Sequence, residues 1–295
     1  MVAPATPHLT LVIPVYNGAR FLRSSLAQAW TWLVARPYAS ELLVVDDGST
    51  DDTAQILAAF VAQHPDLPQC RLTVLRNARN RGKGFSVRRA FLHATGQNIV
   101  FTDADLTYPI DNVEPLEAAL HAGADLAYGS RMHLDSRYVI APTFFGKLFT
   151  RHFMGRTFNL LLRLLVVRGV SDSQAGLKGC RKAAGQLLAR RVRLSRFSFD
   201  VELFYVARRH GLRLAECPVQ FIYRKEPSTV RFVRDSLAMV RDMLKVRWRG
   251  WRGVYDRDPD TATLSDLLHG GGGGGGALPT PAIAAPKPRS LGKSG

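Results

Sequence analysis

The sequence predicts an α/β fold in which helices cover both faces of a mostly parallel sheet. Short apolar segments alternate with amphipathic stretches through the first 130 residues. The apolar segments are continuous rather than alternately apolar and polar, which is typical of parallel strands buried on both faces. A chain of 295 residues with 46% hydrophobic content is large enough for one such domain with appendages.

Each element follows from its local pattern. Five short apolar runs are predicted as strands, at 9–15, 41–46, 71–76, 98–103 and 125–129. Four amphipathic stretches between them are predicted as helices, at 19–36, 51–64, 84–94 and 111–122. Thr50 or Asp51 is the expected N-cap of the second helix.

The pattern changes after residue 144. The segment 147–169 carries five Lys or Arg and no acidic residue, and 229–252 is a second basic amphipathic stretch. The apolar residues of the second stretch recur at helical spacing: Val233, Leu237, Val240, Leu244, Trp248 and Trp251. Tryptophan beside Arg and Lys is typical of a helix in a membrane interface. A core helix with a solvated basic face is the alternative, and the pattern leaves both open.

These changes in pattern set the expected domain organisation. Residues 1–8 form an N-terminal extension and 9–228 the α/β domain, within which 147–169 faces the membrane. An interfacial helix follows at 229–252. Residues 253–295 are predicted as a disordered tail, because they include seven consecutive glycines and then a Pro-rich stretch.

Charge and cysteine content limit the partners and the compartment. A formal net charge of +16 implies an anionic partner, which is nucleic acid, an anionic membrane face or a phosphorylated small molecule. The three cysteines have no C-x-x-C spacing, which favours a reducing cytosol over a zinc or disulfide framework. We expect no signal peptide, and the apolar run 158–167 is too short to span a bilayer. A cytoplasmic or peripheral protein is therefore expected.

Polar residues gather just after the predicted strands. They are Tyr16 and Asn17, Asp46 to Ser49, Arg76 to Lys83, Asp103 and Asp105, and Ser130 and Arg131. In open α/β sheets, ligands bind outside the carboxyl ends of the strands. The clustering predicts a binding site at that edge.

Asp103 and Asp105 in the stretch FTDADLTYP predict a metal site. On an extended segment their side chains point to the same side, and Thr107 continues that face. Oxygen ligands of this kind suit Mg²⁺ or Mn²⁺, which substrate phosphates then complete. A D-x-D string is common by chance, so its position after a buried strand carries the prediction.

Four further segments have two interpretations each. In 44–53, a carboxylate either accepts hydrogen bonds from a ribose or a base, or forms an Asx turn and caps the following helix. The basic, glycine-containing loop 76–90 faces a diphosphate or only solvent, and it lacks the Walker A pattern. In 171–181 and 196–205, Lys178 meets a phosphate or a loop carboxylate. Asp200 or Glu202 faces an acceptor or sugar, or caps a helix.

Taken together, the motifs resemble those of GT-A fold, family 2 glycosyltransferases, over residues 9–248. They are, in order, VIPVYNG, LLVVDDGSTDDT, RNRGKGFSVRRA, FTDADLTYP, YGSR, SDSQAGLKGCR and FSFDVELFYVARRHGLRLAECPV. Within the family they are similar to dolichyl- and polyprenyl-phosphate glucosyl- and mannosyltransferases, and NRGKG, Q-x-G-x-K and FDVE are closest to the β-glucosyl branch. The resemblance implies a nucleotide-sugar donor, Mg²⁺ or Mn²⁺, and a lipid-phosphate acceptor.

The resemblance also implies residue roles. The expected nucleotide-sugar contacts are Pro14, Tyr16, Asn17, Asp46, Asp47, Lys83 and Asp103. The expected metal ligands are Asp103, Asp105 and Thr107, and the expected phosphate or acceptor contacts are Arg131, Arg151 and Lys178. Asp103, Asp105, Asp200 and Glu202 are the catalytic candidates. The chain departs from the family at Gly18, where an acidic residue is usual, and at Ala175 and Leu177.

The resulting hypothesis is metal-dependent, inverting transfer of a hexose to polyprenyl or dolichyl phosphate on the cytoplasmic membrane face. Glucose is favoured and mannose is next, with UDP-glucose or GDP-mannose as the donor. A family 2 enzyme acting on a glycan or protein is the alternative. A basic nucleic-acid-binding protein is a remote one, because no binding motif is found and strand-end carboxylates repel phosphates. No nucleic-acid partner is expected.

Overall fold

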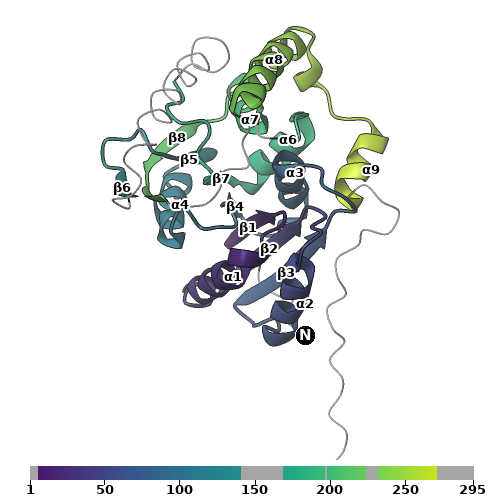
Figure 1. Cartoon of the computed structure of the whole chain (residues 1–295). Coiled ribbons are helices and arrows are strands. Elements are labelled where there is room, and N and C mark those ends of the chain that lie inside the picture. Colours follow the sequence, from purple (N-terminus) through teal and green to yellow (C-terminus); the bar gives the residue numbers. More distant parts are fainter. Residues whose placement is uncertain (1–5, 141–168, 197, 224–231, 271–295) are drawn as a thin grey trace, which may run out of the picture.

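The central feature of the computed structural model is a seven-stranded sheet (Figure 1). The structure describes residues 6–140, 169–196, 198–223 and 232–270. The strand order is β3 (Cys70–Arg76), β2 (Ser40–Asp46), β1 (Leu9–Val15), β4 (Asn98–Phe101), β7 (Lys178–Arg181), β5 (Leu126–Ser130) and β8 (Leu214–Pro218). Only β7 within this sheet is antiparallel to its neighbours. The prediction of a mostly parallel sheet is confirmed.

Helices cover both faces of the sheet, as predicted. One face packs against α1 (Ala19–Val34), α2 (Thr53–Gln63) and α4 (Val113–His121), and α4 follows a 3-10 turn, η1 (Ile110–Asn112). The other packs against α3 (Lys83–His93), α6 (Lys182–Arg191) and α7 (Phe199–Arg209), with α8 (Phe232–Trp251) outside α7 (Figure 1). Leu11 and Ile13 of β1 join the first core and Val12 joins the second, because strand side chains alternate between faces.

Four of the strands were not predicted from the sequence. β7 reads KGCR, which is short and charged, and β8 reads LAECP. A second sheet pairs β6 (Arg137–Ile140) with β9 (Gln220–Tyr223). Their neighbours place these segments in sheets, because isolated four- or five-residue runs carry little intrinsic strand preference.

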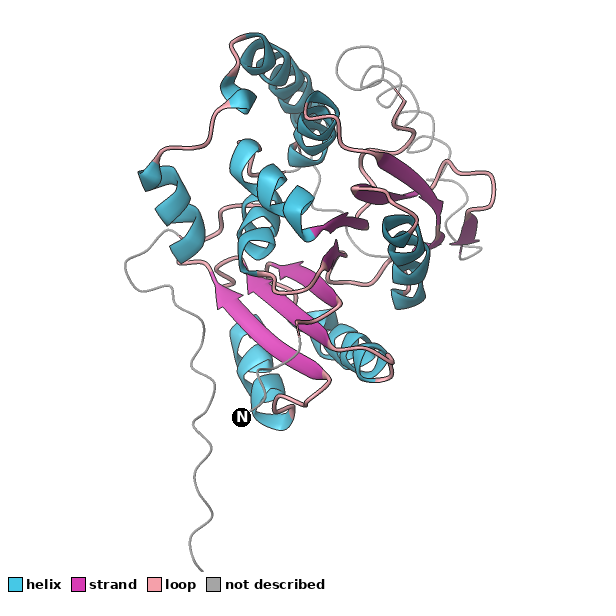
Figure 2. Cartoon of the chain, turned by 180° about the vertical axis from the view of Figure 1, so that it is seen from behind, coloured by secondary structure: helices cyan, strands magenta, loops and turns pink. Residues whose placement is uncertain are grey.

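The first part of the segment predicted as a disordered tail, 253–270, is folded. Within it lie the 3-10 turn η3 (Val254–Asp256) and α9 (Thr261–His269). Tyr255 and Leu267 are buried, and Asp260 caps α9 by accepting the Thr263 N–H at 2.6 Å. The prediction was wrong up to Gly270, because single apolar anchors between polar residues do not form a periodic pattern. Figure 2 shows α9 beside the carboxyl end of β3. Residues 271–295 lie outside the described part.

The two basic segments have different outcomes. The helix expected at 229–252 is confirmed as α8. The segment 147–169, apart from Gly169, lies outside the described residues, and so does Arg151. In the part of the chain that the structure describes, no helix is both long and apolar enough to cross a membrane.

Candidate active site

The strand-end loops meet at one edge of the sheet, as the sequence predicted. The loop after β1 is joined to the loop after β2, because Asn17 N–H donates to Ser49 Oγ at 2.9 Å and Asn17 Oδ1 accepts the Thr50 N–H at 2.8 Å. Asn17 has a φ of 50°, a left-handed conformation that Asn tolerates well. Tyr16 beside it is 46% exposed, and Pro14 is half-buried in β1.

Asp46 and Asp47 differ in what their oxygens contact. Asp46 is buried and its Oδ1 accepts the Ser49 N–H at 2.9 Å. Its Oδ2 is buried without a hydrogen-bond partner among the described residues, although Arg76 Nε lies 3.4 Å away. Buried polar atoms are normally paired, so this oxygen indicates a place for a ligand donor.

Asp47 instead holds the loop 77–82. Its Oδ1 accepts hydrogen bonds from Asn77 Nδ2 at 2.6 Å and the Arg81 N–H at 3.0 Å, and its Oδ2 accepts the Gly82 N–H at 2.7 Å. These contacts are all within the protein. The structure therefore gives Asp47 a positioning role, and the nucleotide contact that the resemblance implied stays a prediction.

Loop 77–82 ends by presenting Lys83 at the first residue of α3. Gly82 has a φ of +93°, and a Cβ there would lie 2.4 Å from the Ser195 carbonyl oxygen, so glycine is required. Lys83 Nζ lies 2.5 Å from Asp103 Oδ1. Burial alone would lower the pKa of Lys83, but the charges of Asp103, Asp200 and Asp105 together raise it. Lys83 therefore stays cationic among three carboxylates.

Asp103 and Asp105 lie in a turn, not on an extended segment. β4 ends at Phe101, Leu106 N–H donates to the Asp103 carbonyl at 3.1 Å, and Leu106 has a φ of 46°. The prediction that both side chains lie on one side of an extended segment was therefore wrong. Asp105 Oδ1 accepts the Thr107 N–H at 3.0 Å. Gly176 lies against Asp103, where an added Cβ would be 1.8 Å from Asp103 Oδ2.

The carboxylate pair of Asp103 and Asp105 fits a divalent metal only if a substrate supplies further ligands. The described residues contain no group of three or more His, Cys, Asp or Glu that could hold a metal ion. Two carboxylates are nevertheless the usual protein share of an Mg²⁺ site that a substrate diphosphate completes. The donor chemistry of Asp103 and Asp105 fits that arrangement.

Lys178 is buried and hydrogen-bonded to groups of the protein. Its side chain is fully buried, and Nζ donates to Asp200 Oδ1 at 2.5 Å and to the Ala175 carbonyl at 2.6 Å. Burial lowers the pKa of Lys178, and the adjacent Asp200 opposes that shift. This ammonium is enclosed with its partner carboxylate, and its predicted phosphate contact stays a prediction. The charge of Asp200 also raises the pKa of Lys83, so this carboxylate interacts electrostatically with both lysines.

Glu202 belongs to the core rather than to the site. Its Oε2 accepts the Arg193 N–H at 2.7 Å and the Leu194 N–H at 2.5 Å. Its Oε1 accepts the Tyr255 hydroxyl at 2.5 Å and Arg249 Nη1 at 3.3 Å. This fully buried carboxylate joins the α6–α7 loop to α8 and η3, so its observed contacts are structural, and the catalytic role stays a prediction without support from them.

Arg131 is held by a residue that the sequence did not single out. Asp172, nearly fully buried, accepts Arg131 Nε at 2.7 Å, Nη2 at 2.9 Å and the backbone N–H at 3.0 Å. Burial would raise the pKa of Asp172, but the charge and hydrogen bonds of Arg131 lower it overall. The proposed acceptor contact of Arg131 stays a prediction.

Helix α9 is a second feature that sequence reasoning missed. Arg81 pairs with Asp266 through two hydrogen bonds of 3.0 and 2.5 Å. Ala78 N–H donates to the Gly270 carbonyl at 3.2 Å, so both ends of loop 77–82 are tied. The cap Asp260 and the final Gly270 were the local signals that could have revealed this helix.

Comparison with known proteins agrees with this geometry. The model of the family "Glycosyl transferase family 2" matches residues 10–189, and the chain belongs to that family. It is 30% identical over 261 residues to the dolichyl-phosphate beta-glucosyltransferase of Mus musculus, covering 85% of this chain and 78% of the relative. It is 26% identical to the Dictyostelium discoideum enzyme of that name, covering 84% and 76%.

Solved structures support the GT-A fold. Glucosyl-3-phosphoglycerate synthase from Mycobacterium tuberculosis in complex with uridine diphosphate is 21% identical, with a TM-score of 0.54 over 87% of this chain and 83% of that one. A mannosyltransferase from Pyrobaculum calidifontis in complex with GDP-Man and Mn²⁺ is 20% identical, with a TM-score of 0.53 over 91% and 71%. At these identities the likeness shows the fold alone.

Proposed function

We propose that this glycosyltransferase transfers a hexose from a nucleotide sugar to polyprenyl or dolichyl phosphate with inversion. UDP-glucose is the favoured donor and GDP-mannose the next. The observation that carries the proposal is the meeting of Lys83, Asp103 and Asp105 at the carboxyl edge of the sheet. The names of the relatives at 26–30% identity support the lipid-phosphate acceptor and glucose.

The charged side chains of the site have different proposed roles. Asp46 Oδ2, buried without a hydrogen-bond partner among the described residues, accepts a donor group of the nucleoside. Lys83 holds Asp103 in place and adds positive charge beside the diphosphate. A Mg²⁺ or Mn²⁺ ion on Asp103 and Asp105, with Thr107 as a predicted third ligand, would supply the charge that a departing nucleoside diphosphate needs.

The acceptor needs little activation. A phosphate monoester has a second pKa near ~6, so it is largely dianionic at neutral pH and no strong general base is required. Its oxygen forms the new bond to the anomeric carbon as the bond to the nucleoside diphosphate breaks on the opposite face. Arg131, oriented by Asp172, is the proposed acceptor contact on this chain.

We also propose that the enzyme works at the cytoplasmic membrane face, with α8 in the interface. Leu244, Trp248 and Trp251 are 60%, 56% and 82% exposed, whereas Met243 and Val246 of the same helix are buried. The tryptophans therefore do not pack into the core. Exposed aromatic residues among basic ones favour an anionic lipid surface.

The test uses purified protein, polyprenyl phosphate and a panel of labelled UDP- and GDP-sugars, with and without Mn²⁺. We expect label from UDP-glucose to enter the organic phase only when metal is present, and Asp103→Ala to lose this activity. Label that stays with an aqueous glycan or protein would instead support the alternative acceptor class. Near-normal turnover by Asp103→Ala at saturating metal would contradict the metal role.

A further inference from the structure

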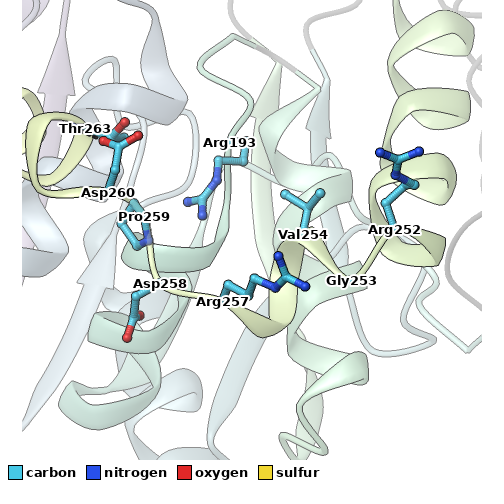
Figure 3. A pocket seen from close by; sticks show the side chains of 9 residues that line it. All are labelled: Arg193, Arg252, Gly253, Val254, Arg257, Asp258, Pro259, Asp260 and Thr263. Atoms are coloured by element: carbon cyan, nitrogen blue, oxygen red, sulfur yellow. Dashed lines mark hydrogen bonds between the residues drawn. The ribbon is translucent and has the colours of Figure 1, made fainter.

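A cavity of about 290 Å³ lies between the end of α8, the turn η3 and the start of α9 (Figure 3). Its lining includes three arginines, Arg193, Arg252 and Arg257, from three separate segments of the chain. Its volume is near the lower end of the ~300–1,000 Å³ range of small-molecule sites. None of these residues belongs to the site around Lys83 and Asp103.

The arginines of this cavity form no salt bridge with a described carboxylate, although the charges of Glu202 and Asp260 act on Arg193 at longer range. Among the described residues, no carboxylate lies within ion-pair distance of the guanidinium groups of Arg193, Arg252 or Arg257. Arg193 Nη1 donates to the carbonyl oxygen of Arg190 instead. In Figure 3 the Arg193 side chain extends toward Pro259 and the Arg257 side chain toward Gly253, while the Arg252 side chain lies beside α8. Like charges that line one cavity repel each other, and a bound anion would offset that repulsion.

The two aspartates of the lining are engaged elsewhere. Asp258 lies 3.3 Å from Arg191 Nη2, and Asp260 accepts the Thr263 N–H at 2.6 Å to cap α9. In Figure 3 the Asp258 carboxylate points away from Arg257, and the Asp260 carboxylate lies beside Thr263. The cavity therefore presents guanidinium groups, which match phosphate oxygens through charged, paired hydrogen bonds.

The cavity adjoins the exposed tryptophans of α8. Arg252 follows Trp251 in the chain, and its guanidinium carbon lies 5.3 Å from the centre of the Trp248 ring. An occupant of the cavity would thus sit where the apolar face of α8 ends. This position distinguishes a lipid headgroup, whose acyl chains continue along Trp248 and Trp251, from a soluble anion.

We infer that this cavity is a binding site for the phosphate headgroup of an anionic phospholipid. The inference rests on the proposed placement of α8 in the membrane interface and assigns the headgroup contacts to Arg193, Arg252 and Arg257. It concerns a lipid that anchors the enzyme, separate from the polyprenyl phosphate that accepts the sugar.

The test compares charge removal inside and outside the cavity. Full-length protein is titrated with phosphatidylcholine vesicles that contain or lack phosphatidylglycerol. The variants are Arg257→Gln, Arg193→Gln and the matched control Arg241→Gln, which removes an exposed α8 charge whose carboxylate partner, Asp242, is 4.0 Å away. Removal of one surface cation should weaken the affinity for anionic vesicles by about fivefold. The cavity variants should lose about a further tenfold, as expected for a direct charge-assisted contact.

Equal losses for all three variants would overturn the headgroup site while leaving the membrane placement intact. Equal binding of wild-type protein to both vesicle types would overturn the membrane placement as well. A third arm titrates inorganic phosphate and follows the Arg257 side-chain resonance. Tight phosphate binding that Arg257→Gln abolishes, without a vesicle effect, would overturn the lipid assignment in favour of a soluble anion. Transfer to a water-soluble short-chain acceptor in vesicle-free buffer tests the proposed function separately.

Discussion

Replacing Gly176 with alanine should disable the metal-site carboxylate without unfolding the protein. The added Cβ would lie 1.8 Å from Asp103 Oδ2, whereas ordinary contact begins at 3.4 Å. Asp103 must therefore retreat by about 1.6 Å, which also breaks its 2.5 Å contact with Lys83. A misplacement of ~1 Å in a catalytic constellation costs about 10²-fold in rate. We expect kcat to fall by about 10²-fold or more.

Stability should change much less than turnover. The Asp103 side chain is 37% exposed, so it has room to turn toward solvent, and we expect a loss of less than ~2 kcal/mol in the free energy of unfolding. The control is Gly211→Ala, where no atom lies within 4 Å of the added Cβ but a φ of +68° makes alanine strained. This control should lose ~1 kcal/mol of stability and keep its kcat.

Steady-state transfer of labelled sugar and denaturant unfolding of the three proteins provide the measurements. A Gly176→Ala enzyme that is folded and turns over like the wild type would refute the reasoning, because Asp103 would then not need its observed position. A loss of kcat in Gly211→Ala that matches its stability loss would attribute the effect to general destabilisation instead.

Two further predictions concern ion pairs. Asp266→Asn should loosen loop 77–82, which would appear as faster hydrogen exchange at Gly82 and Lys83 and as a several-fold lower kcat. Because the Asp266 side chain is 40% exposed, the loss in unfolding free energy should stay below ~1 kcal/mol. Unchanged hydrogen exchange would contradict the tie between the loop and α9. For Asp172, the folded-state pKa is lowered, so its pair with Arg131 stabilises the protein above the ordinary Asp pKa of about 4 and loses that contribution as pH falls through the folded value. The difference in unfolding free energy between wild type and Asp172→Asn should accordingly shrink on acidification from neutral pH to below about pH 3, and a difference that stays constant would exclude this linkage.

The site divides into residues whose location the sequence predicted and residues whose observed partners it did not predict. Asp46, Lys83, Asp103 and Asp105 follow strands that a continuous apolar pattern reveals, and parallel strands bring their carboxyl ends to one edge. Their convergence was therefore predictable before any coordinate was known. The turn at Asp103–Leu106 was not, because it depends on where β4 stops pairing with β1 and β7.

The sequence by itself determined the fold class, the family and the edge of the sheet at which the chemistry occurs, because strand and helix periodicity and ordered motifs are local properties. Tertiary structure decided which charged residues face a ligand and which face one another. Lys178 pairs with Asp200 across 22 positions, Glu202 with Tyr255 across 53, and Arg81 with Asp266 across 185. A charged residue has the same local pattern in a core ion pair as in a binding site. Its role follows from burial and from partners distant in the chain, which no local window contains.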